Sequence, residues 1–277
     1  MSARPHRVVV IAGTATDIGK TWVSVELASR LVADSWAVEA RKPAQSGGPD
    51  DPSDAALLAV VTGESDLVVC PAHRRYPVPM APPMAAEATG LPAPTIEELA
   101  SEVAGSWGVR AADVGLVELA GGVGSPAASD GDGAALAAAI APDGVVLVAD
   151  AGLGTINAVR LSVARLTDAG VVTEDVPVLV FLNRYDDDDD LHRRNRVWLA
   201  DRDRFTVAVD VAAAVDWMIA LVPMHCGYCG RPVTECDGAC ARPLDPDRFC
   251  VRCGRRLVVR VSPASHSATC KVHGSSR

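Results

Sequence analysis

Short apolar runs alternate with helical patterns along most of the chain. The runs are five to eight residues long and carry few charges, which predicts strands that are buried on both faces. They lie at 7–12, 37–41, 113–118, 144–150 and 176–183, and helices are expected at 20–33, 130–141 and 154–169. This order predicts an α/β fold built on a doubly wound, mostly parallel sheet with helices on both sides.

Two stretches interrupt the pattern. Residues 70–94 are rich in proline and predict a loop with one short helix. Five aspartates at 186–190 predict a solvated loop rather than a metal site, because adjacent carboxylates repel one another and do not converge. The chain has no run of 18 apolar residues and no signal-peptide order at its N-terminus, so we expect a cytoplasmic protein without a membrane segment.

Charge and cysteine content divide the chain in two. Residues 1–223 carry 17 Lys and Arg against 31 Asp and Glu, a net charge of −14, whereas residues 224–277 carry 9 against 4, a net charge of +5. Seven of the eight cysteines lie in the second part. We therefore expect two domains, at 1–222 and 224–277. The acidic first part argues against general nucleic-acid binding, and the basic tail leaves that possibility open for itself.

The first predicted strand and helix enclose the stretch GTATDIGKTW at 13–22. In this context the backbone N–H groups of a loop and a helix N-terminus hold phosphate oxygens. A strict Walker A sequence would have a glycine where this chain has Thr14, and Gly13 lies one residue too early. In this interpretation Lys20 reaches the β- and γ-phosphates and the Thr21 hydroxyl binds Mg²⁺. The alternative is a glycine-rich turn without a ligand.

Further features fit an enzyme that handles phosphate. Lys42 ends the second strand, at the sheet edge where ligands bind in open α/β folds. Asp54 begins a helix, and Glu118 ends a strand at the place of a Walker-B-type Mg²⁺ ligand. Asn183 ends the last strand, where it could read a base edge, and the start of the helix at 154–169 is a second anion site. Each of these residues alone also fits a plainer role. Lys42 could be a surface lysine, Asp54 an acid favoured at a helix start, Glu118 an exposed acid at a strand end, and Asn183 a turn-forming asparagine.

The tail contains two Cys-x₂-Cys pairs, Cys226 with Cys229 and Cys250 with Cys253, separated by 20 residues and each followed by glycine. This spacing predicts one tetrahedral thiolate site of the zinc-ribbon type. A second candidate site combines Cys236, Cys240, Cys270 and His273. Thiolates bind zinc and iron–sulfur clusters alike, so spacing does not choose between them. Without a metal, so short a segment could barely bury enough apolar area to fold.

Over residues 7 to about 185 the ordered set of motifs resembles dethiobiotin synthetase. The set reads GTATDIGKT, KPAQSG, SDA, RYPVPMAPPMAAE, VELAGGVGSP, DAGLGTINAVRL and a final N. The family's loop has the form Gly-Thr-x-Thr-x-x-Gly-Lys-Thr, which accounts for Thr14. The resemblance implies an ATP- and Mg²⁺-dependent homodimeric ligase of biotin biosynthesis. In that reaction 7,8-diaminopelargonate takes up CO₂ as a carbamate, ATP phosphorylates the carbamate, and the second amine attacks the mixed anhydride.

The resemblance also assigns roles to residues. Thr21, Asp54 and Glu118 would hold Mg²⁺, and Lys42 and Ser46 would meet the carbamate and the transferred phosphate. The implied catalytic residues are Lys20, Lys42, Thr16, Asp17 and Ser46. The implied nucleotide contacts are Gly13, Thr14, Ile18, Gly19, Lys20, Thr21, Gly121, Gly122 and Asn183. The implied substrate contacts, which hold the carboxylate across a homodimer interface, are Gly154, Thr155, Ile156 and Asn157, with Ser46.

This chain departs from the family pattern at several places. It has Ala15 where members often carry an acid, Ala81-Pro82-Pro83 for a Ser-Pro-His stretch, and Leu119 for a glycine. The proline-containing segment that contacts adenine is not recognisable in 200–222. The tail resembles, over nearly its whole length, the biotin synthase auxiliary protein of actinobacteria. That likeness implies a contact with biotin synthase and a bound zinc ion or iron–sulfur cluster.

Three other interpretations compete with this one. An amidoligase or cobyrinate-type synthase would share the loop but usually adds a glutaminase domain with a nucleophilic cysteine, and Cys70 is isolated. A partitioning-type ATPase switch usually carries an additional lysine in the phosphate loop, and none lies at 13–19. The tail could instead be a nucleic-acid-binding ribbon, but Tyr228 and Phe249 are its only aromatic residues for stacking.

Overall fold

The computed structural model describes residues 2–48, 53–109, 112–221, 225–242, 245–251, 254–262, 265–271 and 274–276. The chain forms two compact units, Met1–Leu221 (unit 1) and Val222–Arg277 (unit 2). The predicted boundary near residue 223 lies outside the described residues. None of the described helices has the length and apolar character needed to cross a bilayer.

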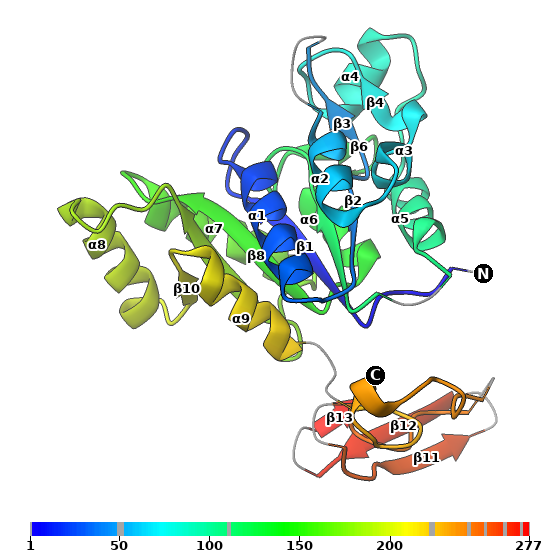
Figure 1. The fold of residues 1–277 in the computed structure, drawn as a ribbon. Coiled ribbons are helices and arrows are strands. Elements are labelled where there is room, and N and C mark those ends of the chain that lie inside the picture. The colour runs from blue at the N-terminus through cyan, green and yellow to red at the C-terminus, as the bar shows by residue number, and fades with distance from the viewer. Residues whose placement is uncertain are drawn as a thin grey trace. The chain divides into compact units, whose positions relative to one another are not determined.

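Six parallel strands of unit 1 form one sheet in the order β10-β9-β8-β1-β5-β2 (Figure 1). They are β1 (Arg7–Gly13), β2 (Val38–Arg41), β5 (Val114–Glu118), β8 (Gly144–Asp150), β9 (Val178–Asn183) and β10 (Thr206–Ala208). From β1 the chain first builds one side of the sheet and then the other. The prediction of a doubly wound parallel sheet is therefore confirmed. The carboxyl end of β1 is the topological switch point, where ligands bind in such folds.

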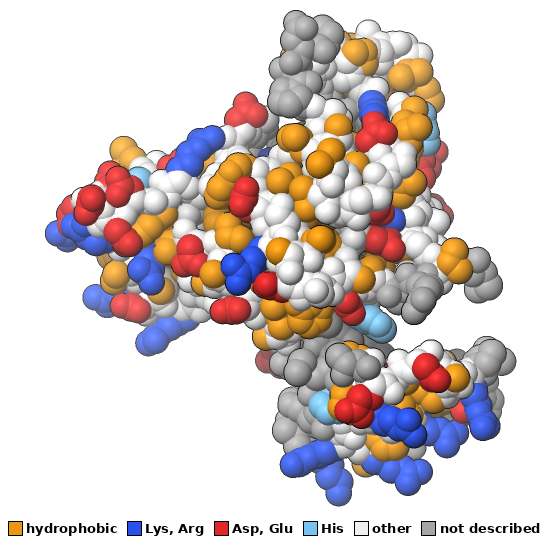
Figure 2. Space-filling view, in the orientation of Figure 1, with side chains coloured by type: hydrophobic (Ala, Val, Ile, Leu, Met, Phe, Trp, Pro, Cys, Tyr) orange, Lys and Arg blue, Asp and Glu red, His pale blue; other side chains and the backbone are white. Residues whose placement is uncertain are grey.

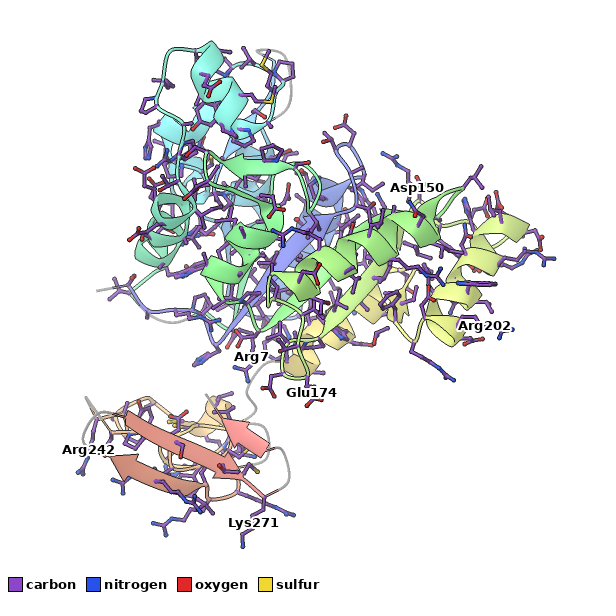
Figure 3. The ribbon with its side chains drawn as sticks, turned by 180° about the vertical axis from the view of Figure 1, so that it is seen from behind. Arg7, Asp150, Glu174, Arg202, Arg242 and Lys271 are labelled. Atoms are coloured by element: carbon purple, nitrogen blue, oxygen red, sulfur yellow. The ribbon has the colours of Figure 1, made fainter. Side chains whose placement is uncertain are left out.

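Helices cover both faces of this sheet (Figure 1). Helix α1 packs against α2 and α9 on one face, and α6 packs against α5 and α7 on the other, seen from behind in Figure 3. The helices of unit 1 are α1 (Lys20–Ala33), α2 (Asp54–Thr62), α3 (Asp66–Val69), α4 (Pro82–Ala88), α5 (Ile96–Ser106), α6 (Gly133–Ile140), α7 (Thr155–Asp168), α8 (Asp190–Val197) and α9 (Val211–Leu221). Shorter elements are β3 (Gln45–Ser46), η1 (Ala72–Arg74), β4 (Arg75–Tyr76), β6 (Pro126–Ala128), β7 (Gly131–Asp132) and the π-helical turn η2 (Trp198–Arg202).

Two predicted boundaries are wrong, and side-chain caps explain both. Helix α6 starts at Gly133 rather than 130, because the Asp132 carboxylate accepts a hydrogen bond from the Ala135 N–H at 2.9 Å and so caps the helix there. The aspartate run is a loop only up to Asp189, which caps α8, and Asp190 is already helical. An acid at this place is favoured by the helix dipole. Charged side chains gather over α8 in Figure 2.

The proline-rich stretch contains the expected short helix, α4, with prolines in its first turn. It also contains η1 and β4, and β4 pairs with β3 in a two-stranded parallel ladder. This ladder holds Ser46 beside the proline-rich stretch, where the Ser46 hydroxyl donates a hydrogen bond to the Met80 carbonyl at 2.6 Å.

A buried arginine fixes the edge strand β2. Arg41 is 2% exposed and forms ion pairs with Glu39 at 2.9 Å and Glu64 at 2.6 Å. Its guanidinium carbon lies 4.4 Å from the centre of the Trp107 ring. Buried charges need such partners, because an unpaired one would lose its hydration without compensation. The cluster therefore anchors the strand that leads to Lys42.

Unit 2 is a small antiparallel sheet of β11 (Val258–Ser262), β12 (Ser265–Cys270) and β13 (Gly274–Ser276), preceded by η3 (Val233–Glu235). Its core cluster among the described residues comprises Cys250, Leu257, Ala268 and Cys270. Figure 2 shows Lys and Arg side chains gathered on one side of this unit, and Figure 3 shows Arg242 and Lys271 extending from it. So small a core provides little apolar burial for independent stability.

Candidate active site

The loop between β1 and α1 is shaped to receive an anion. Gly19, which precedes α1, has φ +90°, and no side chain of the described residues caps the helix start. The first N–H groups of α1 therefore remain available to phosphate oxygens, as in phosphate loops. Two constraints require glycine at position 19: a Cβ there would strain the backbone, and it would collide with the Asn183 amide.

Lys20 folds back over this loop. Its side chain is nearly buried, and its ammonium group donates a hydrogen bond to the Ala15 carbonyl at 3.0 Å. Two effects lower the pKa of Lys20 to about 8: burial, which is the larger, and the nearby Lys42 ammonium. An anion bound in the loop would favour the charged form of Lys20 again.

Four side chains converge beside Lys20, from α1, α2, β5 and the residue that follows β2. The Thr21 hydroxyl lies 2.8 Å from both Asp54 Oδ1 and Glu118 Oε1. The Lys42 ammonium lies 2.7 Å from Asp54 Oδ2 and 2.5 Å from Glu118 Oε1. Burial alone would lower the pKa of Lys42, but the carboxylates of Glu118 and Asp54 raise it, so this lysine stays charged. Burial works against ionisation of Asp54 as well, yet Lys42 holds its pKa below the ordinary value.

The same group fits a divalent cation. One hydroxyl and two carboxylates are hard oxygen ligands of the kind that Mg²⁺ prefers next to nucleotide phosphates. Glu118 is only 1% exposed, and its second oxygen, Oε2, has no hydrogen-bond partner among the described residues. A buried carboxylate oxygen normally has a partner, so this atom is a candidate ligand for a cation.

The glycine turn after β5 lies against the phosphate loop. A Cβ on Gly122 would come within 3.2 Å of the Thr14 carbonyl, and a Cβ on Gly121 would come within 3.9 Å of the Thr16 hydroxyl. The neighbouring Asp17 is exposed and has φ 57°, an uncommon backbone conformation for a non-glycine residue. The structure thus brings the predicted glycines next to the predicted loop residues.

The remaining candidates lie around this centre. Ser46 lies on β3, and the neighbouring Gln45 side chain accepts a hydrogen bond from the Ala55 N–H at 3.0 Å, at the start of α2. Residues 154–157 start α7 after β8, the strand beside β1, and Asp150 ends that strand (Figure 3). Thr155 is 4% exposed, and its hydroxyl has no hydrogen-bond partner among the described residues.

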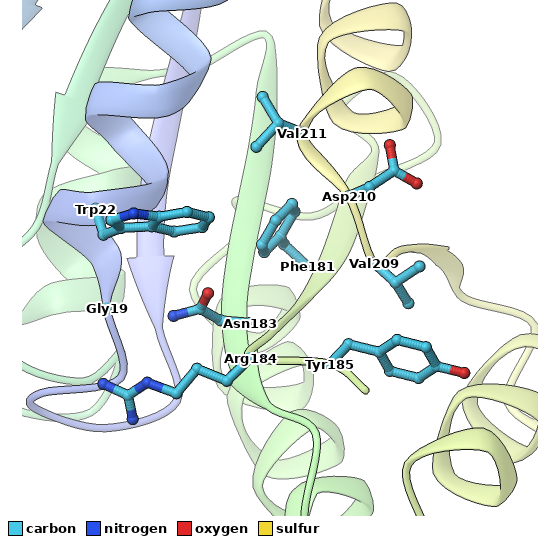
Figure 4. A pocket seen from close by; sticks show the side chains of 9 residues that line it. All are labelled: Gly19, Trp22, Phe181, Asn183, Arg184, Tyr185, Val209, Asp210 and Val211. Atoms are coloured by element: carbon cyan, nitrogen blue, oxygen red, sulfur yellow. The ribbon is translucent and has the colours of Figure 1, made fainter. Parts of the chain in front are cut away.

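A pocket of about 470 Å³ opens on the other side of Gly19 (Figure 4). Its lining residues are Gly19, Trp22, Phe181, Asn183, Arg184, Tyr185, Val209, Asp210 and Val211. Trp22 of α1 faces Phe181 of β9 across the pocket. Asn183 donates its side-chain N–H to the Ile18 carbonyl at 2.9 Å, which leaves the Asn183 carbonyl oxygen as an acceptor for a ligand. Aromatic walls and a fixed amide suit a flat heterocycle with an exocyclic amine.

Most of this pocket was not predicted from the sequence. Trp22 could have been found, because a large aromatic side chain in the first helical turn after a phosphate loop is a readable signal of a base pocket. Residues 209–211 carried no such signal. Val209 and Asp210 connect β10 to α9, Val211 begins α9, and Asp210 accepts a hydrogen bond from the Ala213 N–H at 2.9 Å. Leu119 does not crowd Glu118, because its side chain is buried in the main hydrophobic cluster instead.

Cys70 does not have the character of a nucleophile. It is 0% exposed, and burial raises the pKa of its thiol to about 11. Reactive cysteines are accessible and have a lowered pKa. The high pKa argues against a glutaminase-type nucleophile at Cys70, although the charges of Lys42 and Asp54 lie close enough to affect this thiol.

In unit 2 the cysteines group differently from the prediction. The sulfurs of Cys226, Cys229, Cys236 and Cys240 all lie within 4.8 Å of one another. The two predicted knuckles do contact each other through their backbones, since the His225 N–H donates to the Val251 carbonyl at 2.8 Å. Cys250 is not a member of this group of four and lies in the small core with Cys270, so the predicted combination of Cys226 and Cys229 with Cys250 and Cys253 stays a prediction. Cys253 and His273 lie outside the described residues.

The chain is similar to known proteins over unit 1. A protein-family model described as an AAA domain matches residues 7–224. The ATP-dependent dethiobiotin synthetase BioD of Rhodococcus jostii is 37% identical over 172 residues, which cover 59% of this chain and 69% of that protein. The proteins of the same name from Streptomyces avermitilis and Corynebacterium efficiens are 41% and 39% identical, over 57% and 59% of this chain and 65% and 71% of their own lengths.

Solved structures share the fold at low sequence identity. Cobyrinic acid a,c-diamide synthase of Mycobacterium smegmatis superposes with a TM-score of 0.51 at 15% identity, covering 78% of this chain and 93% of that one. A plasmid partition protein of Borrelia burgdorferi reaches 0.50 at 11% identity, covering 78% and 99%. Both support the architecture of unit 1 and nothing finer.

Proposed function

The chain belongs to the dethiobiotin synthetase family, and on this premise we propose that unit 1 closes the ureido ring of dethiobiotin from 7,8-diaminopelargonate, CO₂ and ATP. The observation that carries the proposal is the convergence of Thr21, Asp54, Glu118 and Lys42 beside the phosphate loop. This reaction needs a nucleotide, a metal ion and a cation near the same transferred phosphoryl group.

The residues around the phosphate loop would divide the phosphoryl transfer among them. Lys20 and the N–H groups at the start of α1 would hold the phosphate oxygens. Thr21, Asp54 and Glu118 would hold Mg²⁺, which neutralises charge on the phosphates when bound. Lys42 remains charged and lies at the carboxyl edge of the sheet, so it can stabilise the anionic carbamate oxygen that attacks the γ-phosphorus.

Ring closure then requires the second amine to reach the carbonyl carbon of the carbamoyl phosphate. Phosphate leaves as the C–N bond forms, and the amine loses a proton. Asp17, Thr16 and Ser46 would contact the substrate around this centre, as the family resemblance implies. The main contribution of the site is positioning, because holding two reacting groups in one molecule at the correct distance lowers the barrier by entropy alone.

The pocket beside Gly19 would bind adenine. Trp22 and Phe181 offer aromatic faces, and the free carbonyl oxygen of Asn183 can accept a hydrogen bond from the exocyclic amine. This pocket offers a base site even though the family's proline segment is not recognisable in the sequence.

The helix start at 154–157 would hold the substrate carboxylate in a homodimer. Its backbone N–H groups and the unpartnered Thr155 hydroxyl suit an anion. Leu153, in the turn before α7, is 94% exposed, and Leu161, within α7, is 64% exposed. Apolar side chains so exposed favour a protein contact. Light scattering of the purified chain would test the dimer by giving twice the monomer mass of 28.8 kDa.

We also propose that unit 2 serves biotin synthase, the enzyme of the next step, with a metal bound by its cysteines. The support is its sequence resemblance to the actinobacterial auxiliary protein and its four convergent thiols. The test adds the purified full chain, or a full chain with cysteine substitutions in unit 2, to a biotin synthase assay. The yield of biotin per dethiobiotin is then compared between the two.

The synthetase activity is tested by turnover of the full chain with ATP, Mg²⁺, bicarbonate and diaminopelargonate, with phosphate and dethiobiotin measured together. We expect equal amounts of both products and none with Lys20→Ala. Phosphate without dethiobiotin would indicate a nucleotide site that serves another substrate or an ATPase switch. Full activity of Lys20→Ala would refute the assignment of the phosphate loop.

A further inference from the structure

The four cysteines at the start of unit 2 come from two successive turns of the chain. In the first, Cys226 accepts a hydrogen bond from the Gly230 N–H at 2.9 Å and donates its own N–H to the Arg231 carbonyl at 2.8 Å. The second turn runs from η3 through Cys236 to Cys240 and contains Gly238, which has φ 77°. Each turn supplies two of the four sulfurs, which all lie within 4.8 Å of one another.

The sulfur positions match the size of a single coordination tetrahedron. A metal ion with four bonds to sulfur of about 2.3 Å has sulfur–sulfur edges of about 3.8 Å. Cys226 and Cys240 lie 3.4 Å apart, Cys229 and Cys236 lie 3.7 Å apart, and Cys236 and Cys240 lie 3.4 Å apart, measured between sulfurs. The other pairs lie within 4.8 Å. These separations are also too long for disulfide bonds, which need about 2.05 Å.

An iron–sulfur cluster would need more room. Four cysteines bind two irons in a [2Fe–2S] cluster and four irons in a [4Fe–4S] cluster, and sulfurs bound to different irons lie farther apart than the edges of one tetrahedron. Among divalent ions with four thiolates, zinc binds more tightly than iron in the general order of stability. We propose that Cys226, Cys229, Cys236 and Cys240 together bind one tetrahedral zinc ion.

The ion would stabilise a unit that has little core of its own. The described core cluster of unit 2 has four residues, far fewer than a segment of this length needs to fold by apolar burial. The site is therefore structural, and it is independent of the synthetase activity proposed for unit 1. A closed site with four protein ligands leaves no open position for a substrate.

The test compares the zinc content of the purified full chain with that of Cys226→Ser, Cys236→Ser and the double variant. We expect each single variant to lose one zinc per chain and the double variant to lose the same single ion, because both residues bind it. Loss of two ions by the double variant would overturn the proposal, since the two residues would then belong to separate sites. A single variant that keeps the same zinc content as the native chain would overturn it as well.

Direct ligation is tested with cobalt in place of zinc. Cys240→His should keep one ion, while the thiolate-to-cobalt absorption falls by about a quarter, as four thiolates become three. An unchanged band would exclude Cys240 as a ligand, even if every serine variant simply unfolds unit 2. Bound iron with acid-labile sulfide, lost in Cys236→Ser, would show a cluster and refute the single ion.

Two controls separate this result from other failures. Cys70→Ala removes a cysteine of unit 1 and should keep the full metal content. Dethiobiotin turnover is measured for every variant. Metal loss with unchanged turnover supports the site, and a chain that lacks turnover in all variants counts against the proposed function alone.

Discussion

Lys42 is predicted to matter for the stability of unit 1 as well as for catalysis. Lys42→Met removes the only cation within 2.5 Å of Glu118 among the described residues, and Glu118 is 1% exposed. The carboxylate then remains in a place where water cannot replace the lost partner. Its charge becomes a cost of folding.

The size of this cost follows from the burial of both partners. At an effective dielectric constant near 20, opposite charges 2.5 Å apart attract by about 6–7 kcal/mol. The loss of hydration of two buried ions offsets most of this gain, so the intact pair contributes little net stability. Removing one ion leaves the desolvation of the other uncompensated, which costs about 3–5 kcal/mol. We expect a destabilisation of that order for Lys42→Met.

Tryptophan fluorescence during urea unfolding measures this effect in unit 1 alone, because all five tryptophans lie before residue 222. The experiment is done with EDTA, so that no metal ion replaces the lysine. Arg30→Met, which breaks an exposed ion pair with Asp34, is the control and should cost about 0.5 kcal/mol or less.

The double variant Lys42→Met, Glu118→Gln decides whether the reasoning is correct. It removes the stranded charge and should recover at least half of the stability lost by Lys42→Met. A single-variant cost below about 1 kcal/mol would refute the argument. So would a double-variant cost equal to the sum of the two single costs, because the two groups would then not be coupled.

Three further outcomes follow from the geometry. Gly19→Ala should weaken nucleotide binding at least tenfold in calorimetry and destabilise unit 1 by about 1–3 kcal/mol. The reason is that the added Cβ collides with Asn183 and that φ at this residue is +90°. A nucleotide affinity like that of the native chain would contradict this. Nucleotide binding should take up about 0.9 protons at pH 9 and about 0.1 at pH 7, because phosphates raise the pKa of Lys20 from about 8 toward its ordinary value. Titrations in buffers of different ionisation enthalpy measure this uptake, and equal uptake at both pH values would exclude Lys20 as its source. Arg41→Met leaves two carboxylates without their cation and should cost about 3–5 kcal/mol in urea unfolding, whereas a cost near that of an exposed pair would refute a buried network.

The sheet was predictable because its strands are buried on both faces. The apolar runs leading to Gly13 and Glu118 carry a signal that needs no knowledge of neighbours. Helix α5 was missed although Thr95 and Glu98 form a capping box, which is a readable signal of a helix start. Strand β10 has three residues and depends on its pairing with β9, so its sequence alone could not identify it.

The two candidate sites differ in how much their sequence revealed. Around the phosphate loop each residue follows a strand or begins a helix, and parallel topology then brings strand ends together, as for Lys42 and Glu118. The cysteines follow no such rule. Repeated Cys-x₂-Cys spacing suggested that two like knuckles share a metal, whereas the short path through η3 brings Cys236 and Cys240 to Cys226 first. Which thiols meet is decided by turn geometry that spacing does not contain.

The Asn183 side chain has a consequence for how this enzyme could change its nucleotide during evolution. One end of its amide holds the Ile18 carbonyl of the phosphate loop, and the other end faces the base pocket. A substitution that recruits a different base at this position would also loosen the grip on the phosphates. Residues 209–211 line the same pocket, and the Asp210 carboxylate accepts a hydrogen bond from the Ala213 N–H at the start of α9. We therefore expect substitutions at 209–211 to change base preference with less effect on phosphate binding than substitutions at Asn183.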